Sequence, residues 1–239
     1  LRTPIQKAAF QSSTEVPNLS SPLRILVLGG SKGSSGLNHL AVKALGAIEH
    51  DIMIWHQTGV HDADAIRDAY QAKHKDAQVA HFIDDMVETM RDANGAGLAA
   101  NQVYTPIQIC VIEVGDNPRY PYKPKIPLEV LVNPQITVLS DEEFENFEGC
   151  LSVPNLRGRV RRKAEVQVDY VDREGTPHQK VVRGITAGTY QHEVDHLLGK
   201  VFLDRVFDSN SLCTWQEFDR HYRDDFVKEA EAIVKKYGS

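Results

Sequence analysis

Residues 191–199 read Gln191-His192-Glu193-Val194-Asp195-His196-Leu197-Leu198-Gly199, and the rest of the chain can be interpreted outward from them. The two histidines are four residues apart, so on a helix both imidazoles lie on one face and can bind the same metal ion. The glutamate between them can reach a water on that ion without being a ligand itself, which is typical of metal-assisted hydrolysis. The same pattern also occurs in helices with two surface histidines and no metal, so alone it leaves both interpretations open.

The composition is that of an ordinary globular protein. The 239 residues are 41% hydrophobic and 25% charged, which is enough for one large domain or two small ones. A net charge of -6 gives no reason to expect a nucleic acid or an anionic membrane as partner, and no apolar run is long enough to cross a bilayer. Three scattered cysteines suit a reducing cytoplasm better than a disulfide framework. No signal peptide is visible, although the chain begins with leucine rather than methionine.

An alternation of strand and helix patterns follows the proline-containing first 22 residues. The first apolar run ends in two glycines, and residues 31–36 form a glycine- and serine-rich turn. Short apolar runs alternating with helical patterns predict a βαβ layer with a parallel sheet. The expected strands are residues 23–28, 51–55 and 78–81, and the expected helices are residues 37–48 and 62–72.

From Phe82 onward the alternation ends, and we expect an α+β fold. A helix over residues 82–93 should stop at Asn94-Gly95, which is a common C-terminal signal. Residues 172–175 predict a turn between two strands, and a last amphipathic helix is expected from about residue 211 to residue 237. The expected strands are residues 107–114, 130–139, 164–171 and 179–183.

Two further stretches contain residues with reactive or hydrogen-bonding side chains. Residues 148–152, Glu-Gly-Cys-Leu-Ser, place Cys150 where a thiolate could be a third metal ligand, whereas the other two cysteines fit buried apolar positions. Residues 95–102, Gly-Ala-Gly-Leu-Ala-Ala-Asn-Gln, expose backbone and end in Gln102, a side-chain amide donor. The alternative for that run of small residues is a close-packed turn after a helix.

Taken in order, the three motifs resemble those of the peptide deformylase family, G-x-G-L-A-A-x-Q, E-G-C-L-S and Q-H-E-x-D-H. The resemblance covers residues 82 to about 207, and residues 1–19 also look like the family's N-terminal region. It implies a cytoplasmic metallo-amidohydrolase that converts an N-formylmethionyl peptide and water into formate and a methionyl peptide. It implies mixed and antiparallel sheets around the H-E-x-x-H helix, and nascent peptides at the ribosome as substrates.

The resemblance also assigns the metal site. Cys150, His192 and His196 would be the ligands of one divalent ion, Fe(II) in cells, with zinc, nickel or cobalt able to substitute. A water on this ion would attack the formyl carbon, with Glu193 first as general base and then as general acid toward the leaving amine. No organic cofactor is expected.

The remaining implied roles concern the substrate. The side-chain amide of Gln102 and the backbone N–H of Leu151 would stabilise the tetrahedral oxyanion. Tyr104 stands where the family usually has glycine. Two small residues stand where the wall of the methionine pocket is usually bulkier, which predicts a wide pocket that accepts side chains larger than methionine. The expected substrate-binding residues are Ala96, Gly97, Gly188 and Thr189.

About sixty residues, 20–81, separate the two deformylase-like parts. They resemble the start of the second domain of the bacterial N-acetylglucosaminyltransferase that completes lipid II, at residues 26–33, 54–57 and 82–86. Because residues 82–86 fit both families, the chain looks like a chimera with its junction in one shared helix. We therefore expect a deformylase domain of residues 1–19 and 82–239, and an inserted βαβ segment of residues 20–81.

The expected role of this segment is structural. Its glycine-rich turn could bind a phosphate at a helix N-terminus, but the later parts of the transferase's sugar-nucleotide pocket are missing. So small a unit buries little core, and we expect it to pack on the deformylase domain or on a second copy of itself.

Two other functions stay open at the level of sequence. The H-E-x-x-H pattern alone would also allow a zinc endopeptidase, although a cysteine ligand is not typical of that class. A non-catalytic sugar-nucleotide-binding or scaffold protein built around residues 20–81 is the second alternative.

Overall fold

The computed structural model describes residues 23–28, 35–48, 52–58, 62–72, 77–79, 82–115 and 122–239. The expected N-terminal region and most of the glycine-rich turn lie outside these residues. The chain divides into two compact units, and the division falls between Met86 and Val87. The larger unit contains the described residues of 87–171 and 177–239, and the smaller contains those of 23–86 together with the turn at residues 172–176.

The smaller unit is built on a three-stranded parallel sheet in the order β1-β2-β3. Its core contains the fully buried side chains of Ile54, Ile66 and Tyr70. The buried His56 binds two neighbours within this unit, Asn38 Oδ1 and Tyr70 Oη, each at 3.0 Å. The elements in order are β1 (Leu23–Leu28), α1 (Ser35–Leu45), β2 (Ile52–Gln57), α2 (Ala63–Gln71) and β3 (Ala77–Val79).

Helix α3 (Phe82–Asp92) carries the chain across the division between the units. It ends as the sequence predicts, because Asn94 takes the left-handed conformation with φ of 52° and its N–H bonds back to Arg91. Asparagine tolerates this conformation better than most residues. The short strand β4 (Gly97–Ala99) follows directly.

The larger unit contains a five-stranded antiparallel sheet in the order β10-β9-β6-β5-β4. Four of its strands correspond to the expected ones, and only β4 was not predicted. Its buried face is apolar, with Ile112, Leu131 and Val168 fully excluded from solvent. The strands not yet bounded are β5 (Ile109–Val114), β6 (Ile126–Val138), β9 (Glu165–Val171) and β10 (Pro177–Arg183).

A separate antiparallel hairpin pairs β7 (Glu143–Cys150) with β8 (Val153–Lys163). We did not predict these strands, because buried polar side chains interrupt the apolar pattern that marks a strand. The fully or nearly buried polar residues on the two strands are Asn146, Glu148, Arg157 and Arg162. Cys150 is the last residue of β7, and a two-residue turn follows it.

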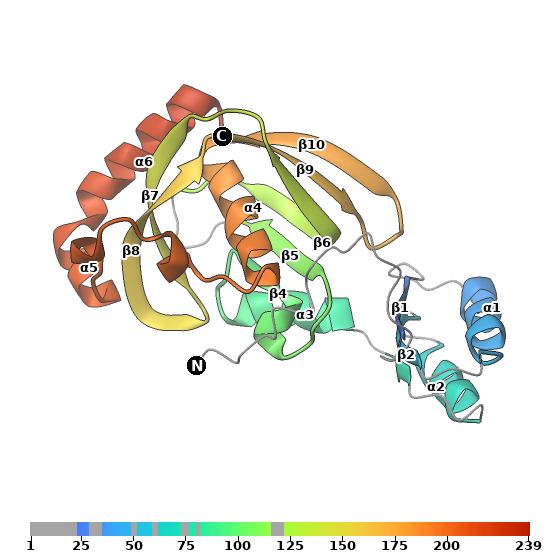
Figure 1. Cartoon of the computed structure of the whole chain (residues 1–239). Coiled ribbons are helices and arrows are strands. Elements are labelled where there is room, and N and C mark those ends of the chain that lie inside the picture. Colours follow the sequence, from blue (N-terminus) through green and yellow to red (C-terminus); the bar gives the residue numbers. More distant parts are fainter. Residues whose placement is uncertain are drawn as a thin grey trace. The chain divides into compact units, whose positions relative to one another are not determined.

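Helix α4 (Gly184–Leu197) contains both histidines and contacts strands of the five-stranded sheet and of the hairpin (Figure 1). The expected final helix is wrong in its length, because the chain forms α5 (Trp215–His221) and α6 (Arg223–Tyr237) with a break at Tyr222. Both helices pack aromatic rings against Phe147 of the hairpin. In the described ranges, no helix combines the length and apolar character needed to cross a membrane.

Candidate active site

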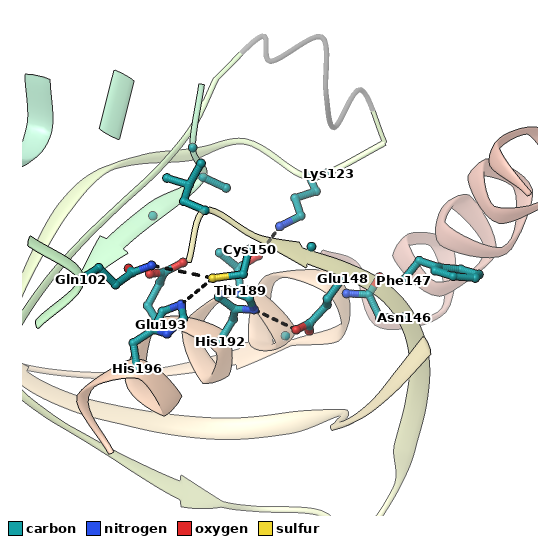
Figure 2. Close-up of a pocket in the computed structure, with 16 residues that line it drawn as sticks. Gln102, Lys123, Asn146, Phe147, Glu148, Cys150, Thr189, His192, Glu193 and His196 are labelled. Carbon is teal, nitrogen blue, oxygen red and sulfur yellow. Dashed lines mark hydrogen bonds and ion pairs between the residues drawn. The ribbon is translucent and has the colours of Figure 1, made fainter. Parts of the chain in front are cut away.

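Three side chains that could bind a metal converge between the hairpin and α4. Cys150 lies at the end of β7, and His192 and His196 lie one turn apart on α4 (Figure 2). One ligand atom from each lies within 4.8 Å of the other two. The Cys150 Sγ is 3.2 Å from His196 Nε2, and the imidazole ring centroids are 4.8 Å apart. This geometry suits one ion held by a thiolate and two imidazoles.

The outer nitrogen of each histidine is held by another group. His192 Nδ1 donates to Glu148 Oε2 at 2.8 Å, and His196 Nδ1 donates to the carbonyl oxygen of Lys200 at 3.1 Å. In both rings this leaves Nε2 as the nitrogen available to an ion. Such bonds fix the tautomer and the orientation of metal-binding histidines.

The surroundings of Cys150 favour the thiolate that a metal ligand must be. Burial alone would raise the pKa of Cys150, but hydrogen bonds and charges from His192 and His196 outweigh it and lower the pKa to about 5. The backbone N–H of Ser152 also donates to Sγ, at 3.3 Å. The donor set and its hydrogen bonds therefore fit a divalent transition metal.

Behind the histidines lies a buried network of charged groups. Arg162 forms two hydrogen bonds with Glu148, each of 2.8 Å, and a third with Asp195 at 2.5 Å. Arg205 binds the same aspartate through both of its oxygens. Burial would raise the pKa of Glu148, but Arg162 and His192 hold it well below its usual range. The network therefore keeps Glu148 ionised and links the hairpin to α4.

Glu193 points into the same cavity but stands apart from that network. The residue is 4% exposed, and in the described part of the chain its Oε2 has no hydrogen-bond partner. Burial raises its pKa, partly opposed by the positive charges of the two neighbouring histidines. A carboxyl group with a raised pKa can both accept and return a proton near neutral pH.

Gly97 on β4 makes room for this carboxylate. A Cβ atom at Gly97 would lie 2.3 Å from Glu193 Cδ and 2.4 Å from its Oε1, far inside van der Waals contact. Only glycine at this position therefore allows the observed position of Glu193.

Gln102 is oriented toward the cysteine by its own neighbours. It lies in the 3₁₀ helix η2 (Ala100–Val103), and its Oε1 accepts from the backbone N–H of Ala99 at 2.9 Å. Its Nε2 consequently points into the site, donating to Ser152 Oγ at 2.8 Å and lying 3.7 Å from Cys150 Sγ. The amide therefore points as a hydrogen-bond donor toward Cys150.

All ten site residues expected from the sequence line one cavity, although their individual roles remain predictions. We also did not predict six polar or charged residues, of which three line the cavity and three lie behind it. Glu148 and Asp195 lie inside the sequence motifs and could have been found there, whereas the other four lie outside them. The unpredicted residues are Lys123 and Asn146 in the wall, Glu148 beside them, and Arg162, Asp195 and Arg205 behind the histidines.

A helix with two histidines and a buried glutamate, facing a cysteine on a β-hairpin, defines a metal-dependent hydrolase. The family model described as polypeptide deformylase matches residues 61–211, which is more than half of the chain. The chain belongs to this family. It is a hydrolase that removes the formyl group from nascent peptides in a metal-dependent reaction.

Individual relatives agree with this assignment. Peptide deformylase 2 of Nostoc sp. is 38% identical over 143 residues, covering 60% of this chain and 80% of that protein. A peptide deformylase of Leptospira biflexa is 41% identical over 126 residues, covering 52% and 70% respectively. The Met-Ala-Ser-bound crystal structure of class I type b peptide deformylase from Acinetobacter baumannii has a TM-score of 0.51 at 42% identity, covering 53% of this chain and 79% of that one.

A second family model matches the first part of the chain. The C-terminal domain of glycosyltransferase family 28 matches residues 24–96, so the two matches overlap over residues 61–96. Both resemblances noted in the sequence are therefore found, and they fit a chimeric chain.

Proposed function

We propose that Cys150, His192 and His196 hold the metal and that Glu193 moves the protons of deformylation. The observation that carries this assignment is the convergence of three donor atoms beside a buried carboxylate with an unpartnered oxygen in the described chain. A divalent ion bound there would polarise the formyl carbonyl and lower the pKa of a water molecule toward neutrality.

The protein groups then divide the remaining work. Glu193 takes a proton from the attacking water and returns it to the amine that leaves as formate is released. Gln102 Nε2 and the backbone N–H of Leu151 donate to the developing oxyanion. Loss of one such donor typically lowers the rate by about 10²–10³-fold.

The metal in cells is proposed to be Fe(II). One thiolate and two imidazoles also suit zinc, nickel and cobalt, so these ions should bind the same site. Purification with and without oxygen, followed by metal analysis and activity measurement, tests this. Full activity of an iron-free zinc form prepared from cells would contradict it.

The proposed substrates are N-formylmethionyl nascent peptides in the cytoplasm, at the ribosome. The crystal structure of the relative from Acinetobacter baumannii contains bound Met-Ala-Ser, which supports a site that accepts a short peptide. Formyl-Met-Ala-Ser is therefore the first substrate to assay, with an unformylated casein digest to detect an endopeptidase instead.

Residues 20–81 are proposed to be an insertion in a deformylase domain of residues 1–19 and 82–239. The parallel arrangement of β1, β2 and β3 and the match to the glycosyltransferase domain support this division. Deletion of residues 20–81, joining Leu19 to Phe82, should retain deformylation and remove any self-association seen by sedimentation. A deleted protein that folds and binds metal but is inactive would contradict the insertion.

The roles of the site residues can be tested with Glu193→Ala. This variant should keep its metal content and lose deformylation, because Glu193 moves protons and does not bind the ion. Glu231→Ala, an exposed position on α6, is the matched control and should leave both unchanged. Parallel loss of metal and activity in Glu193→Ala would show instead that Glu193 is a ligand.

A further inference from the structure

One wall of the cavity is polar. Lys123, Asn146 and Thr189 line it on the side away from Gln102 (Figure 2). They come from three separate parts of the chain: the segment before β6, strand β7 and helix α4. No sequence motif contains all three, and the reaction at the formyl group uses none of them.

Lys123 directs its ammonium group into this wall. Its Nζ donates to Thr189 Oγ1 at 3.3 Å, and the threonine hydroxyl donates in turn to the Ile185 carbonyl oxygen at 3.3 Å. Burial lowers the pKa of Lys123, although the carboxylates of Glu148 and Glu193 partly oppose this. Lys123 is partly buried, and a partly buried cation is costly beside an apolar ligand and favourable beside an oxygen acceptor.

Asn146 supplies a second polar group with unused hydrogen-bonding capacity. The residue is 4% exposed, and its Oδ1 lacks a hydrogen-bond partner among the residues that the structure describes. Groups of this kind are uncommon in folded proteins and often belong to ligand sites.

The small size of Gly188 predicted a wide pocket, but the cavity is not widened at this position. A Cβ atom at Gly188 would lie 3.1 Å from Phe144 Cζ and 3.8 Å from Asn146 Nδ2. The neighbouring side chains therefore occupy the space that glycine leaves. The small residue allows the Phe144 ring and the Asn146 amide to approach α4. Compared with an apolar wall, this wall is therefore more polar but no wider.

The geometry points to a first-residue pocket in which Lys123, held by Thr189, donates a hydrogen bond to an oxygen at the end of the substrate's first side chain. The Oδ1 of Asn146 is an acceptor, so it does not bind this oxygen and can accept only from a donor group of a ligand. This inference rests on the proposed function, because it takes the formyl carbon to lie at the Cys150–His192–His196 cluster. The first side chain branches from the atom next to the formylated nitrogen, so it must lie against the walls of this same cavity. Oxidation of formylmethionine gives a sulfoxide, which is polar and carries such an oxygen.

The test uses three peptides, formyl-X-Ala-Ser, in which X is methionine sulfoxide, glutamine or norleucine. Norleucine is an apolar side chain of methionine's length, and glutamine carries an amide oxygen in place of the sulfoxide. The full-length protein is compared with Lys123→Met, which removes the charge and keeps the length. Lys125→Met, at an exposed position two residues away, is the matched control.

The full-length protein should use the sulfoxide peptide at least as well as the norleucine peptide, measured as kcat/KM. Lys123→Met should lower this ratio by about tenfold or more, as expected for loss of a charged hydrogen bond. Lys125→Met should leave it unchanged. If Lys123→Met does not fold, Thr189→Val provides the same comparison.

Three results would overturn the inference. The first is a preference of the unmodified protein for norleucine of more than about tenfold. The second is an unchanged ratio in a folded Lys123→Met protein. Use of glutamine with rejection of the sulfoxide would exclude oxidised methionine as the ligand. Formyl-Met-Ala-Ser is assayed alongside, and failure to deformylate this peptide as well as the other three would overturn the proposed function itself, and this inference with it.

Discussion

Replacing Gly97 by alanine should strongly lower the activity of the enzyme without removing the metal. The added Cβ would lie 2.3 Å from Glu193 Cδ and 2.6 Å from its Cγ. Ordinary contacts begin near 3.4 Å, so the carboxylate or the strand must move by about 1 Å. A misplacement of about 1 Å at a catalytic group can lower the rate by about 10²-fold.

The substitution should disturb the proposed metal ligands less than it disturbs Glu193. No atom of the proposed ligands Cys150, His192 and His196 is among the three atoms nearest to the new Cβ, all of which belong to Glu193. The expected result is therefore a kcat/KM for formyl-Met-Ala-Ser about 10²-fold lower, with metal content near that of the unmodified protein.

The control is Gly115→Ala, because a Cβ at Gly115 would meet no atom within 4 Å. It should leave activity and melting temperature nearly unchanged. The reasoning would be refuted if a folded, metal-loaded Gly97→Ala enzyme kept activity within about threefold of the unmodified protein. That result would mean that Glu193 can act from another position, or does not act at all.

Three further substitutions or conditions give measurable outcomes. Cys150→Ser should weaken metal binding by at least about tenfold and change its pH dependence, because a thiol ligand must lose its proton. Titration with a competing chelator at several pH values measures the affinity and its pH dependence. Tyr104→Gly should raise the free energy of unfolding by about 0.5–1 kcal/mol in urea denaturation. Tyr104 is 82% exposed and has φ of 63°, a left-handed conformation that glycine adopts at lower cost. A decrease would indicate that the ring makes contacts that stabilise the fold. Burial lowers the pKa of His56 to about 4, so this group does not reduce the stability of the smaller unit above pH 6.5. As pH falls from 6.5 toward 4, the free energy of unfolding of this unit should decrease by about 1.4 kcal/mol per pH unit. Amide hydrogen exchange in β2 and α2, corrected for intrinsic rates, should show this loss, and protection that rises on acidification would contradict it.

Sequence patterns predicted the elements whose apolar residues follow the period of their secondary structure. Strands β5, β6 and β9 and the end of α3 at Asn94 were recognised for this reason. The H-E-x-x-H spacing likewise predicted that two imidazoles share one face of α4, because residues four apart are neighbours on a helix.

The hairpin of β7 and β8 could not be predicted in the same way. Glu148 and Arg162 are buried there because they bind each other and His192, and a pattern based on hydropathy treats both as surface residues. Local patterns fail at such sites because the compensating partner is distant in sequence. The break at Tyr222 was missed for another reason, since the aromatic spacing continues through it without a glycine or proline.

Lys123 and Asn146 show what sequence motifs omit even when they identify the site. Both side chains reach the cavity from positions that no motif marks, and only the folded chain brings them to Thr189 and Gly188. The metal-binding chemistry of Cys150, His192 and His196 could be inferred from sequence motifs. The polarity of the cavity wall formed by Lys123, Asn146 and Thr189 depends on long-range packing.

The hydrogen bonds from Arg162 to Glu148 and Asp195 have a consequence for metal exchange. They hold one histidine through Glu148 and secure α4 through Asp195, using protein groups alone. The conformational entropy of ordering the side chain of His192, a proposed ligand, is therefore lost during folding rather than during metal capture. A site prepared in this way can release one ion and take up another without rebuilding itself, so the identity of the bound metal should follow the supply of ions in the medium.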